Sequence, residues 1–221
     1  NYENLVIPKI ISYLEINNVE LLLMEWIDMN NIDQQKLGKG LGEMHIESNK
    51  FNPKSFGYPI DGYIGTTNQI KGLDKNWIKC FINFRIEPQI ELLKKDFLAI
   101  DIKNKLKTKI ESELDEHEPF NCLVHGDLWS GNVGVNQINK GVIFDPACWW
   151  ADCEVDIAMT RLFGNFQSEF YENYHKIIPI QKGFEQRTII YNFYHILNHA
   201  NMFGGEYLKQ VKDYVKAILN M

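Results

Sequence analysis

The sequence predicts an α+β fold that is mainly helical, and three observations support this prediction. Apolar residues recur at spacings of three and four through most of the chain after residue 28, as in amphipathic helices. Short apolar stretches typical of strands lie mainly in the first 28 residues and around residues 120–145. A hydrophobic content of 45% in 221 residues is enough for a sizeable core. We therefore divide the chain into a small β segment, residues 1–28, and a helical domain, residues 29–221.

Two strands are predicted in the first segment, over residues 5–14 and 19–27, joined by a turn at Asn17-Asn18. The second strand contains VELLLMEW and is apolar almost throughout. Such a strand is typical of a buried position in a sheet, so we do not expect it to be an exposed edge.

The first predicted helix follows Asp33, which can cap it. Its apolar face is formed by Leu37, Leu41 and Met44 at helical spacing. Glycines at 38, 40 and 42 give the sequence GKGLG, which has some likeness to a phosphate-binding loop. The spacing fits no such pattern, and the segment does not follow a strand directly. We interpret these glycines as small residues that allow close helix packing.

Residues 49–74 are rich in Asn, Gly, Pro and Asp, which predicts a long surface loop that includes GYIGTT at 62–67. Loops of this length are often functional. A helix is predicted from Trp77, interrupted or kinked at Pro88, and another begins at about Asp101. The second of these helices carries Leu106, Ile110 and Leu114 at a spacing of four.

Strands are predicted at residues 122–124, 133–135 and 141–144. If the second and third form a hairpin, the residues just before and just after that hairpin share one end of it. The remainder of the chain is predicted to be helical, over residues 154–163, 167–176, 185–201 and 205–219.

Charge and composition argue against several functional classes. The net charge of −6 argues against a general nucleic-acid binder, which usually has a basic face. No apolar stretch approaches the length of a membrane span, and no signal peptide follows Asn1. No two cysteines form a CxxC pair, so we expect reduced, buried thiols and a cytoplasmic protein, without a zinc site or disulfides. The cysteines are Cys80, Cys122, Cys148 and Cys153.

The most informative stretch is HGDLWSGN, residues 125–132, a polar loop between two apolar strands. It contains Asp127 and Asn132, and Asp145 follows at the end of the next strand pair. The predicted hairpin brings Asn132 and Asp145 to the same end. An amide oxygen and a carboxylate suit Mg²⁺, which takes its other ligands from water and phosphate oxygens. Asp127 is then available to accept the proton of a substrate hydroxyl that attacks a phosphate.

The pattern H-x-D-x-x-x-x-N followed by a strand-end Asp is the arrangement that kinases use for phosphoryl transfer. The alternative is a common HGD turn in which the aspartate only caps backbone groups. Three residues at matching spacing favour the first interpretation. Gly126 stands where protein kinases have an arginine that senses activation-loop phosphorylation. We therefore expect a small-molecule type of kinase without that switch.

Several stretches resemble the fructosamine kinase (ketosamine-3-kinase) family, from about Leu5 to the C-terminus. They are VHGDLWSGNVGV, VIFDPACWWADCEVDIAMTRLFGNF, FEQRTIIYNFYHILNHANMFGGEY, GYIGTTNQ and NWIKCFINFRIEPQI. The HGDLW-GN element is specific to this family and its close relatives, whereas the aminoglycoside and choline kinase group shares only the HGD-N-D skeleton. The resemblance implies a protein-kinase-like fold, here the C-lobe with the hinge and only a remnant of the N-lobe sheet. It also implies phosphorylation, with ATP and Mg²⁺, of a sugar hydroxyl of ribulosamines or fructosamines on small amines or glycated proteins, as deglycation repair.

The resemblance also implies roles for the residues of the predicted site. Asp127 is the proton acceptor, and Asn132 and Asp145 hold Mg²⁺. The segment Glu25-Trp26-Ile27 matches the hinge, whose backbone groups bind adenine.

For some other residues we expect a structural role. For the rest, both a structural role and a role in substrate binding stay open. We expect His125 to orient the loop and Asp156 to anchor the loop backbone from a helix. His199 could line the cleft, although a helix histidine with satisfied hydrogen bonds is the alternative that we prefer. The residues that could either stack on the sugar-amine or pack in the core are Trp129, Trp149 and Trp150.

The chain departs from the family pattern before the hinge. Kinases hold the phosphates with a glycine-rich loop, a strand lysine and a helix glutamate. Few residues precede Glu25, and neither Lys9 nor Glu3 lies in a suitable context. We therefore expect this chain to be a poor kinase on its own and a fragment of an active parent.

Two other functions stay open on the sequence alone. A kinase of the same fold could act on another hydroxylated amine, such as an aminoglycoside or a choline-like compound. A non-catalytic module would bind nucleotide or ligand without turnover. The intact Asp127, Asn132 and Asp145 argue against the second alternative, and the missing N-lobe argues for it. The sequence predicts neither the oligomeric state nor a preference between ribulosamine and fructosamine.

Overall fold

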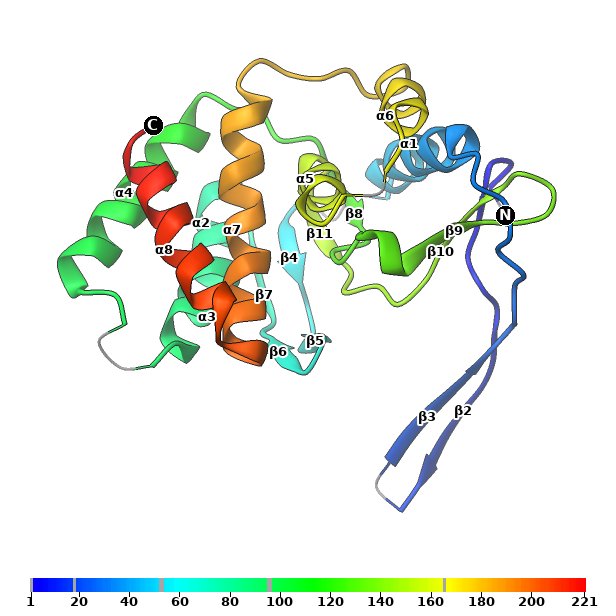
Figure 1. Cartoon of the computed structure of the whole chain (residues 1–221), viewed down its shortest axis with the longest axis horizontal. Helices are drawn as coiled ribbons and strands as arrows, with labels where there is room; N and C mark the ends of the chain where they lie inside the picture. Colours follow the sequence, from blue (N-terminus) through cyan, green and yellow to red (C-terminus); the bar gives the residue numbers. More distant parts are fainter. Residues whose placement is uncertain (1, 18, 52–53, 95–96, 165) are drawn as a thin grey trace.

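The computed structural model describes residues 2–17, 19–51, 54–94, 97–164 and 166–221, and it has the predicted mainly helical α+β fold. Helices lie on both sides of a central group of short strands, and a β-hairpin projects away from them (Figure 1). The α-helices of the described residues are α1 (Gln35–Asn49), α2 (Trp77–Phe81), α3 (Glu87–Leu92), α4 (Ile100–Asp115), α5 (Glu154–Leu162), α6 (Ser168–His175), α7 (Phe184–Phe203) and α8 (Glu206–Leu219).

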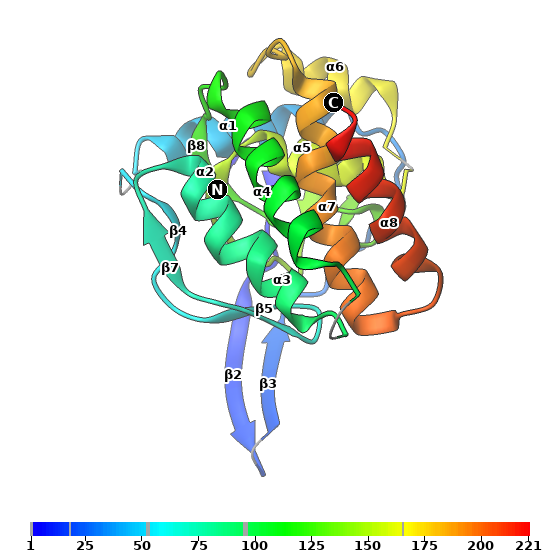
Figure 2. The ribbon, with the colours of Figure 1, turned by 90° about the vertical axis from the view of Figure 1, so that its left-hand side faces the viewer.

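The helices pack around two clusters of buried apolar side chains. The larger cluster includes Ile110 of α4, as the helical spacing predicts, and joins α4 to α7 and α8, which lie side by side in Figure 2. The smaller cluster includes Leu41 and joins α1 to α5 and α6. Leu128 belongs to the smaller cluster and Trp149 to the larger one. The chain between these two residues is therefore held by a core at each end.

The strands predicted around the polar loop are present in two small sheets. β9 (Val133–Val135) and β10 (Gly141–Ile143) pair as the predicted hairpin, with Val142 opposite Gly134. β1 (Leu5–Val6) runs parallel to β10 and completes a sheet of order β1-β10-β9. β8 (Asn121–Val124) pairs with β11 (Trp149–Asp152), a strand that the sequence did not predict.

Residues 49–74 do not form the predicted long surface loop. They contain the short strands β4 (Phe56–Tyr58), β5 (Gly62–Ile64), β6 (Thr67–Gln69) and β7 (Gly72–Asp74). β4 lies inside a sheet of order β7-β4-β11-β8, and GYIGTTNQ forms the β5–β6 hairpin. Strands of three residues are too short to show an alternating pattern. Most of the glycines that suggested a loop lie within these strands, as Gly57, Gly62 and Gly72 do, and Gly65 lies in the β5–β6 turn. Residues 52–53 lie outside the described part of the chain.

The helix predicted from Trp77 is interrupted one turn before Pro88. Residues Ile82–Ile86 form a π-helix between α2 and α3. Pro88 has no N–H for the carbonyl of Phe84, four residues earlier. The guanidinium of Arg85 donates to that carbonyl at 2.7 Å and also lies over the ring of Trp149, 4.2 Å from its centroid. The π-helix thus accompanies a buried arginine that replaces the missing backbone donor.

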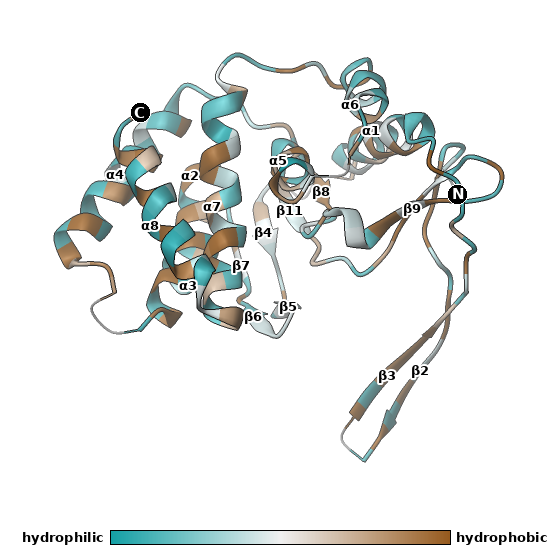
Figure 3. Cartoon of the chain, in the orientation of Figure 1, coloured by the Kyte–Doolittle hydropathy of each residue, from teal (hydrophilic) through white to brown (hydrophobic). Residues whose placement is uncertain are grey.

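The first predicted strand is divided into β1 and β2 (Ile10–Ile16), and β2 pairs with β3 (Val19–Met24). The expectation that this apolar strand is not an exposed edge is wrong, because Leu21, Leu22 and Leu23 are 45% to 55% exposed. Figure 3 shows apolar residues along the projecting hairpin. Among the described residues, β2 and β3 pair only with each other. An apolar strand becomes buried only if other elements cover it. The residue pattern of the strand itself does not predict whether such elements are present.

The glycines of α1 are packing residues, as predicted. A Cβ on Gly38 would lie 2.0 Å from the carbonyl oxygen of Phe170 in α6, and one on Gly42 would lie 2.9 Å from Ile177. Helix α1 can therefore approach α6 at Gly38, and the residues just after α6 at Gly42, only because these positions lack a side chain.

Two predictions from composition can be compared with the structure. The cysteines are free thiols, and all except Cys148 are buried. Burial raises the pKa of Cys80 and of Cys148 to about 12, which keeps both thiols protonated and unreactive. No helix in the described ranges is both long and apolar enough to cross a bilayer.

Candidate active site

The loop between β8 and β9 carries the central residues of the predicted site. It ends in a short 3-10 turn, Ser130–Asn132, which leads into β9. The N–H of Trp129 donates to the carbonyl of Asp127 at 3.1 Å, and the N–H of Asn132 donates to the carbonyl of Trp129 at 3.0 Å. The loop is therefore closed by its own backbone, which fixes Asp127 relative to Asn132.

Asp156 lies beneath this loop on α5, with its side chain fully buried. Its Oδ2 accepts the N–H of His125 at 2.7 Å, and its Oδ1 accepts the N–H of Gly126 at 2.8 Å. His45 of α1 contacts the same carboxylate through Nε2 at 3.2 Å and the hydroxyl of Tyr174 through Nδ1 at 2.9 Å. Burial alone would raise the pKa of Asp156, but the hydrogen bonds from His45 and Gly126 lower it. The charged carboxylate thus holds the loop backbone from below.

His125 and Gly126 connect the loop to the chain after β10. The Nε2 of His125 lies 2.8 Å from the carbonyl of Phe144, and burial lowers the pKa of this histidine, so a neutral ring donates to that carbonyl. Gly126 has a φ of +80°. A Cβ on it would lie 2.1 Å from the carbonyl oxygen of Ala147. An arginine at this position would therefore collide with the backbone, which gives a steric reason for the glycine.

The carboxylate of Asp127 is half-buried at the surface of the loop. Burial raises its pKa to about 6, and the charges of Asp156 and Asp145 act in the same direction. The Nδ2 of Asn132, 3.2 Å from Oδ2, opposes this shift. At pH 7 such a carboxylate is still mostly ionised, and it is a stronger base than an ordinary aspartate. These properties suit a group that accepts a proton from a hydroxyl.

Asn132 and Asp145 lie at one end of the β9–β10 hairpin, as predicted. The Nδ2 of Asn132 donates to the carbonyl of Asp127 at 2.9 Å and to the carbonyl of Asp145 at 3.4 Å. The loop thus engages the amide nitrogen, which leaves Oδ1 as the atom available to a cation. Asp145 is exposed and has a φ of +53°, which is uncommon outside glycine. An amide oxygen beside an exposed carboxylate is a donor set that fits Mg²⁺.

The predicted hinge, Glu25-Trp26-Ile27, directly follows β3. The N–H of Glu25 donates to the carbonyl of Lys9 at 2.9 Å, and a few residues later the N–H of Asn31 donates to the carbonyl of Val135 at 3.3 Å. The hinge segment lines a shallow hollow together with Ile138 in the turn of the β9–β10 hairpin. The same hairpin therefore carries the predicted metal ligands at one end and borders the hinge at the other.

The residues that could stack on a substrate lie in different environments. Trp149 is fully buried and stacks on Trp77 with 5.6 Å between ring centroids, so its position favours packing. Trp150 is half-buried in β11. Trp129 is 39% exposed, two residues after Asp127 in the loop. The structure thus separates Trp149 from the surface of the loop and leaves Trp129 on it.

The hairpin GYIGTTNQ reaches the segment that follows Asp145 through its last residue, Gln69. The Nε2 of Gln69 donates to the carbonyl of Ala147 at 3.3 Å, and its Oε1 accepts the hydroxyl of Tyr194 at 3.0 Å. The side chain of Asn198, also on α7, donates to the carbonyl of Ile64 at 3.4 Å. The hairpin is therefore fixed between α7 and the segment that follows Asp145.

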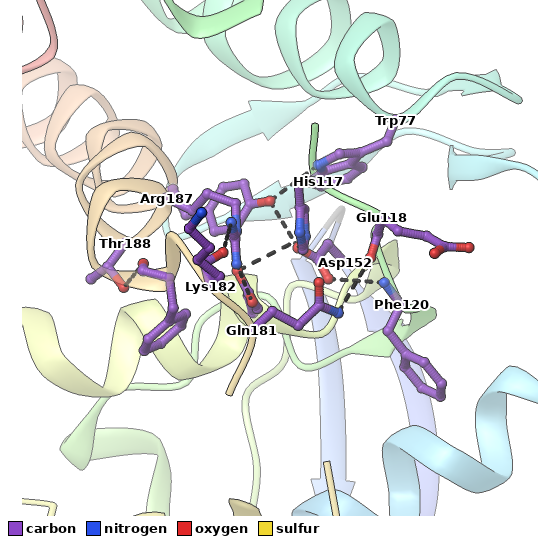
Figure 4. A network of polar contacts seen from close by, with 12 residues as sticks. Trp77, His117, Glu118, Phe120, Asp152, Gln181, Lys182, Arg187 and Thr188 are labelled. Atoms are coloured by element: carbon purple, nitrogen blue, oxygen red, sulfur yellow. Dashed lines mark hydrogen bonds and ion pairs between the residues drawn. The ribbon is translucent and has the colours of Figure 1, made fainter. Parts of the chain in front are cut away.

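A buried polar network that sequence reasoning missed supports the start of α5 (Figure 4). Asp152 accepts hydrogen bonds from His117 at 2.7 Å, from the hydroxyl of Tyr191 at 2.8 Å and from a backbone N–H. Glu154 forms a two-pronged ion pair with Arg187 at 2.6 and 2.8 Å. Three members lie close enough to hold a metal, but each carboxylate oxygen already accepts from a protein donor, so the network fits a structural role. These side-chain partners are 33 to 39 residues apart, which no local pattern reveals.

The fold is mainly helical, and it brings together the loop of Asp127, the amide of Asn132 and the carboxylate of Asp145 after a strand. This arrangement defines a phosphotransferase of the kinase-like fold. A solved aminoglycoside 2′-phosphotransferase has a TM-score of 0.59 at 12% identity, over 98% of this chain and 76% of its own, which is a likeness of fold alone. The sequence profile described as "Fructosamine kinase" matches residues 1–221. The chain belongs to this family of kinases, which use ATP.

The descriptions of individual relatives agree with this family assignment. A protein of Vibrio parahaemolyticus described as a probable ketoamine kinase is 37% identical over 97% of this chain and 74% of its own length. The chloroplastic protein-ribulosamine 3-kinase of Arabidopsis thaliana is also 37% identical, over 90% of this chain and 62% of its own. The crystal structure of a Haemophilus somnus protein described as a fructosamine-3-kinase has a TM-score of 0.86 at 25% identity, over 98% of this chain and 74% of its own. The chain thus spans about three fifths to three quarters of these proteins.

Proposed function

We propose that this protein phosphorylates a sugar hydroxyl of ketosamines, with ATP as the phosphoryl donor. The observation that supports the proposal most is the environment of Asp127, a half-buried carboxylate with a pKa of about 6 beside Asn132 and Asp145. The names of the relatives supply the substrate class, because they refer to ketoamines and protein-bound ribulosamines. We infer that both small ketosamines and glycated proteins are acceptors.

In the proposed reaction, the sugar hydroxyl oxygen attacks the γ-phosphorus of ATP while its proton passes to the carboxylate of Asp127. The new P–O bond forms as the bond between the γ-phosphorus and the bridging oxygen of ADP breaks. Proton transfer of this kind contributes about 10²- to 10⁴-fold to a rate. Asp156, by holding the loop backbone, keeps Asp127 directed at the hydroxyl.

We propose that Asn132 and Asp145 hold Mg²⁺ through the amide Oδ1 and the carboxylate. When bound, the ion neutralises charge on the phosphate oxygens. The backbone of Glu25-Trp26-Ile27 is the proposed contact for adenine. In this interpretation residues 1–28 belong to the N-lobe and hinge, and residues 29–221 form the C-lobe.

We also propose a cytoplasmic location for the protein. Free, unreactive cysteines are what a reducing compartment favours. The net charge of −6 gives no support to a nucleic-acid partner.

The test is ADP release by the full-length gene product with ATP and Mg²⁺, measured with and without ribulosyl-lysine, with mass spectrometry of the sugar-amine. We expect release to require the sugar-amine and to fall by at least about 100-fold in Asp127→Asn with ATP binding kept. Asp213→Asn, an exposed carboxylate on α8, is the matched control. Turnover with an aminoglycoside or choline but not with ribulosyl-lysine would assign another acceptor class. Nucleotide binding without turnover would assign a non-catalytic module.

A further inference from the structure

A row of aromatic rings begins at the loop of the site and continues to the start of α8. The ring of Trp129 meets the ring of Phe163 edge-on, with 6.2 Å between centroids, and Phe163 meets His199 at 5.0 Å. His199 in turn meets Tyr207 at 5.0 Å and Phe203 at 5.7 Å. The five residues come from the loop, the end of α5, the last turns of α7 and the start of α8. We call this set the aromatic row.

The aromatic row is open to solvent over much of its length. Trp129 is 39% exposed and Phe203 is 63% exposed, while Phe163, His199 and Tyr207 are half-buried. Large aromatic side chains usually contribute to cores or to interfaces. Contiguous exposed apolar surface next to a reacting group is typical of a ligand-binding surface.

The polar atoms of the row suit a cationic ligand. The Nδ1 of His199 donates to the carbonyl of His195 at 2.8 Å, which leaves Nε2 as a hydrogen-bond acceptor. Burial lowers the pKa of His199, so its ring is neutral at pH 7 and does not repel a cation. Aromatic faces attract ammonium groups. The secondary amine of a ketosamine is protonated at neutral pH and carries this kind of charge.

Trp129 lies two residues after Asp127 in the same loop, from which we infer the part of a substrate that reaches the row. The two residues are tied by the hydrogen bond from the N–H of Trp129 to the carbonyl of Asp127 at 3.1 Å. In a ketosamine phosphorylated on its third carbon, as the name of the Arabidopsis relative indicates, the amine is attached to the first carbon. The amine therefore lies beside the reacting hydroxyl, and its substituent extends away from the sugar. The row provides an apolar surface that starts at this point of the loop.

We propose that the aromatic row binds the amine-bearing half of the ketosamine. Trp129 and His199 lie beside the ammonium group, and Phe163, Phe203 and Tyr207 contact the substituent of the amine. This inference rests on the proposed function, because it uses Asp127 to place the sugar. A surface of this kind favours amines with apolar or aromatic substituents and disfavours amines that carry a carboxylate close to the nitrogen.

The first experiment compares ribulosamines of the same sugar made from benzylamine, Nα-acetyl-lysine and glycine. We expect kcat/KM to be about 3- to 30-fold higher for the benzylamine derivative than for the glycine derivative, as stacking and cation–π contacts allow. Phe163→Ala and Phe203→Ala should raise KM for the benzylamine derivative and bring the ratio toward one. Phe51→Ala is the matched control, because Phe51 is 73% exposed and lies outside the row. Equal use of the three ribulosamines, unaltered by either substitution, would overturn the inference and leave the proposed function standing.

The second experiment needs no turnover and follows saturation transfer by NMR from the protein to ribulosyl-benzylamine. We expect the strongest transfer at the benzyl protons, and a loss of that transfer in Phe203→Ala but not in Phe51→Ala. Transfer to the benzyl ring without phosphorylation of any ketosamine would support the row as an amine site and count against the proposed function. Transfer confined to the sugar protons, or no transfer at all, would overturn the inference.

Discussion

The carboxylate of Asp156 accepts the backbone N–H of Gly126 at 2.8 Å, one residue before Asp127. Gly126 also faces the carbonyl oxygen of Ala147, which a Cβ would approach to 2.1 Å. The peptide at Gly126 is therefore held between α5 and the segment that follows β10. The N–H of Ala147 also donates to the carbonyl of His125 at 2.8 Å. Backbone hydrogen bonds on both sides of Gly126 therefore hold the peptide from which the Asp127 side chain extends.

The first prediction concerns Gly126→Ala. The substituted residue would have to adopt a φ of +80°, and its new Cβ would collide with the Ala147 carbonyl. We expect a loss of roughly 3 kcal/mol in the free energy of unfolding, from backbone strain and overpacking together. Urea unfolding measures this loss, and kcat should fall as well because Asp127 follows directly.

Two other glycines separate the causes of that loss. Gly164 has a φ of +72°, and a Cβ added to it would meet nothing within 4 Å, so Gly164→Ala should cost only the strain, about 1–2 kcal/mol. Gly62 has open space and no positive φ, so Gly62→Ala should change stability little. If Gly126→Ala costs no more than Gly164→Ala, the contact with Ala147 yields easily and does not fix the loop.

The placement of the candidate residues was predictable where these residues lie close together in the sequence. HGDLWSGN places Asp127 and Asn132 in one loop, and a hairpin of two apolar strands is enough to bring Asp145 to them. The helices follow from apolar spacing, as the buried Ile110 of α4 illustrates. In each case the sequence pattern and the structural element that it predicts lie within a short segment of the chain.

The parts that were not predicted depend on distant partners. Strand β11 is recognisable only once β8 and β4 lie on either side of it, and the same pairing places Trp149 in the core. The exposure of β3 follows from a lack of covering elements among the described residues, not from its own composition. His117 and Arg187 join the network of Figure 4 across more than 30 residues. Hydrophobic periodicity carries no information about such pairings.

The second prediction is a pH dependence that reports Asp127. The proposed proton acceptor must be ionised, and its pKa is raised to about 6, so activity should rise with pH through about 6 and level off above it. An ordinary aspartate would place the midpoint near 4. The measurement is kcat/KM against pH in buffers of constant ionic strength. A profile flat down to about pH 5 would contradict the role proposed for Asp127.

The third prediction separates the metal ligand from the base. Asp145→Asn removes a negative charge from the proposed Mg²⁺ site, and we expect the Mg²⁺ concentration for half-maximal activity to rise by about tenfold or more. Asp127→Asn should lower kcat and change the Mg²⁺ requirement much less. Metal titration of both variants at saturating ATP tests this. Identical responses of the two variants would show that the two carboxylates do not have separate roles.

The fourth prediction uses two ion pairs that join the same two helices, α5 and α7. Glu154 pairs with Arg187, and both side chains are buried, at 8% and 5% exposure. Glu185 pairs with Arg161, and its side chain is 73% exposed. Each carboxylate makes two short contacts with its arginine. Glu154 engages Nε and Nη2 of its arginine, and Glu185 engages Nη1 alone. The larger difference is burial, so the exposed pair serves as a control for the buried one.

Glu154→Gln leaves the charge of Arg187 buried without its counter-charge, so we expect a loss of about 3–5 kcal/mol in the free energy of unfolding. Glu185→Gln should cost less than about 1 kcal/mol, because solvent screens the exposed pair. Thermal and urea unfolding of both variants measure the difference.

Glu154 begins α5 and Asp156 lies in the same first turn, so local opening there would also release the loop that carries Asp127. At a temperature where Glu154→Gln is still folded, kcat should approach that of the unaltered protein. A low kcat in the fully folded variant would instead mean that the network acts on the position of Asp156 and not only on stability.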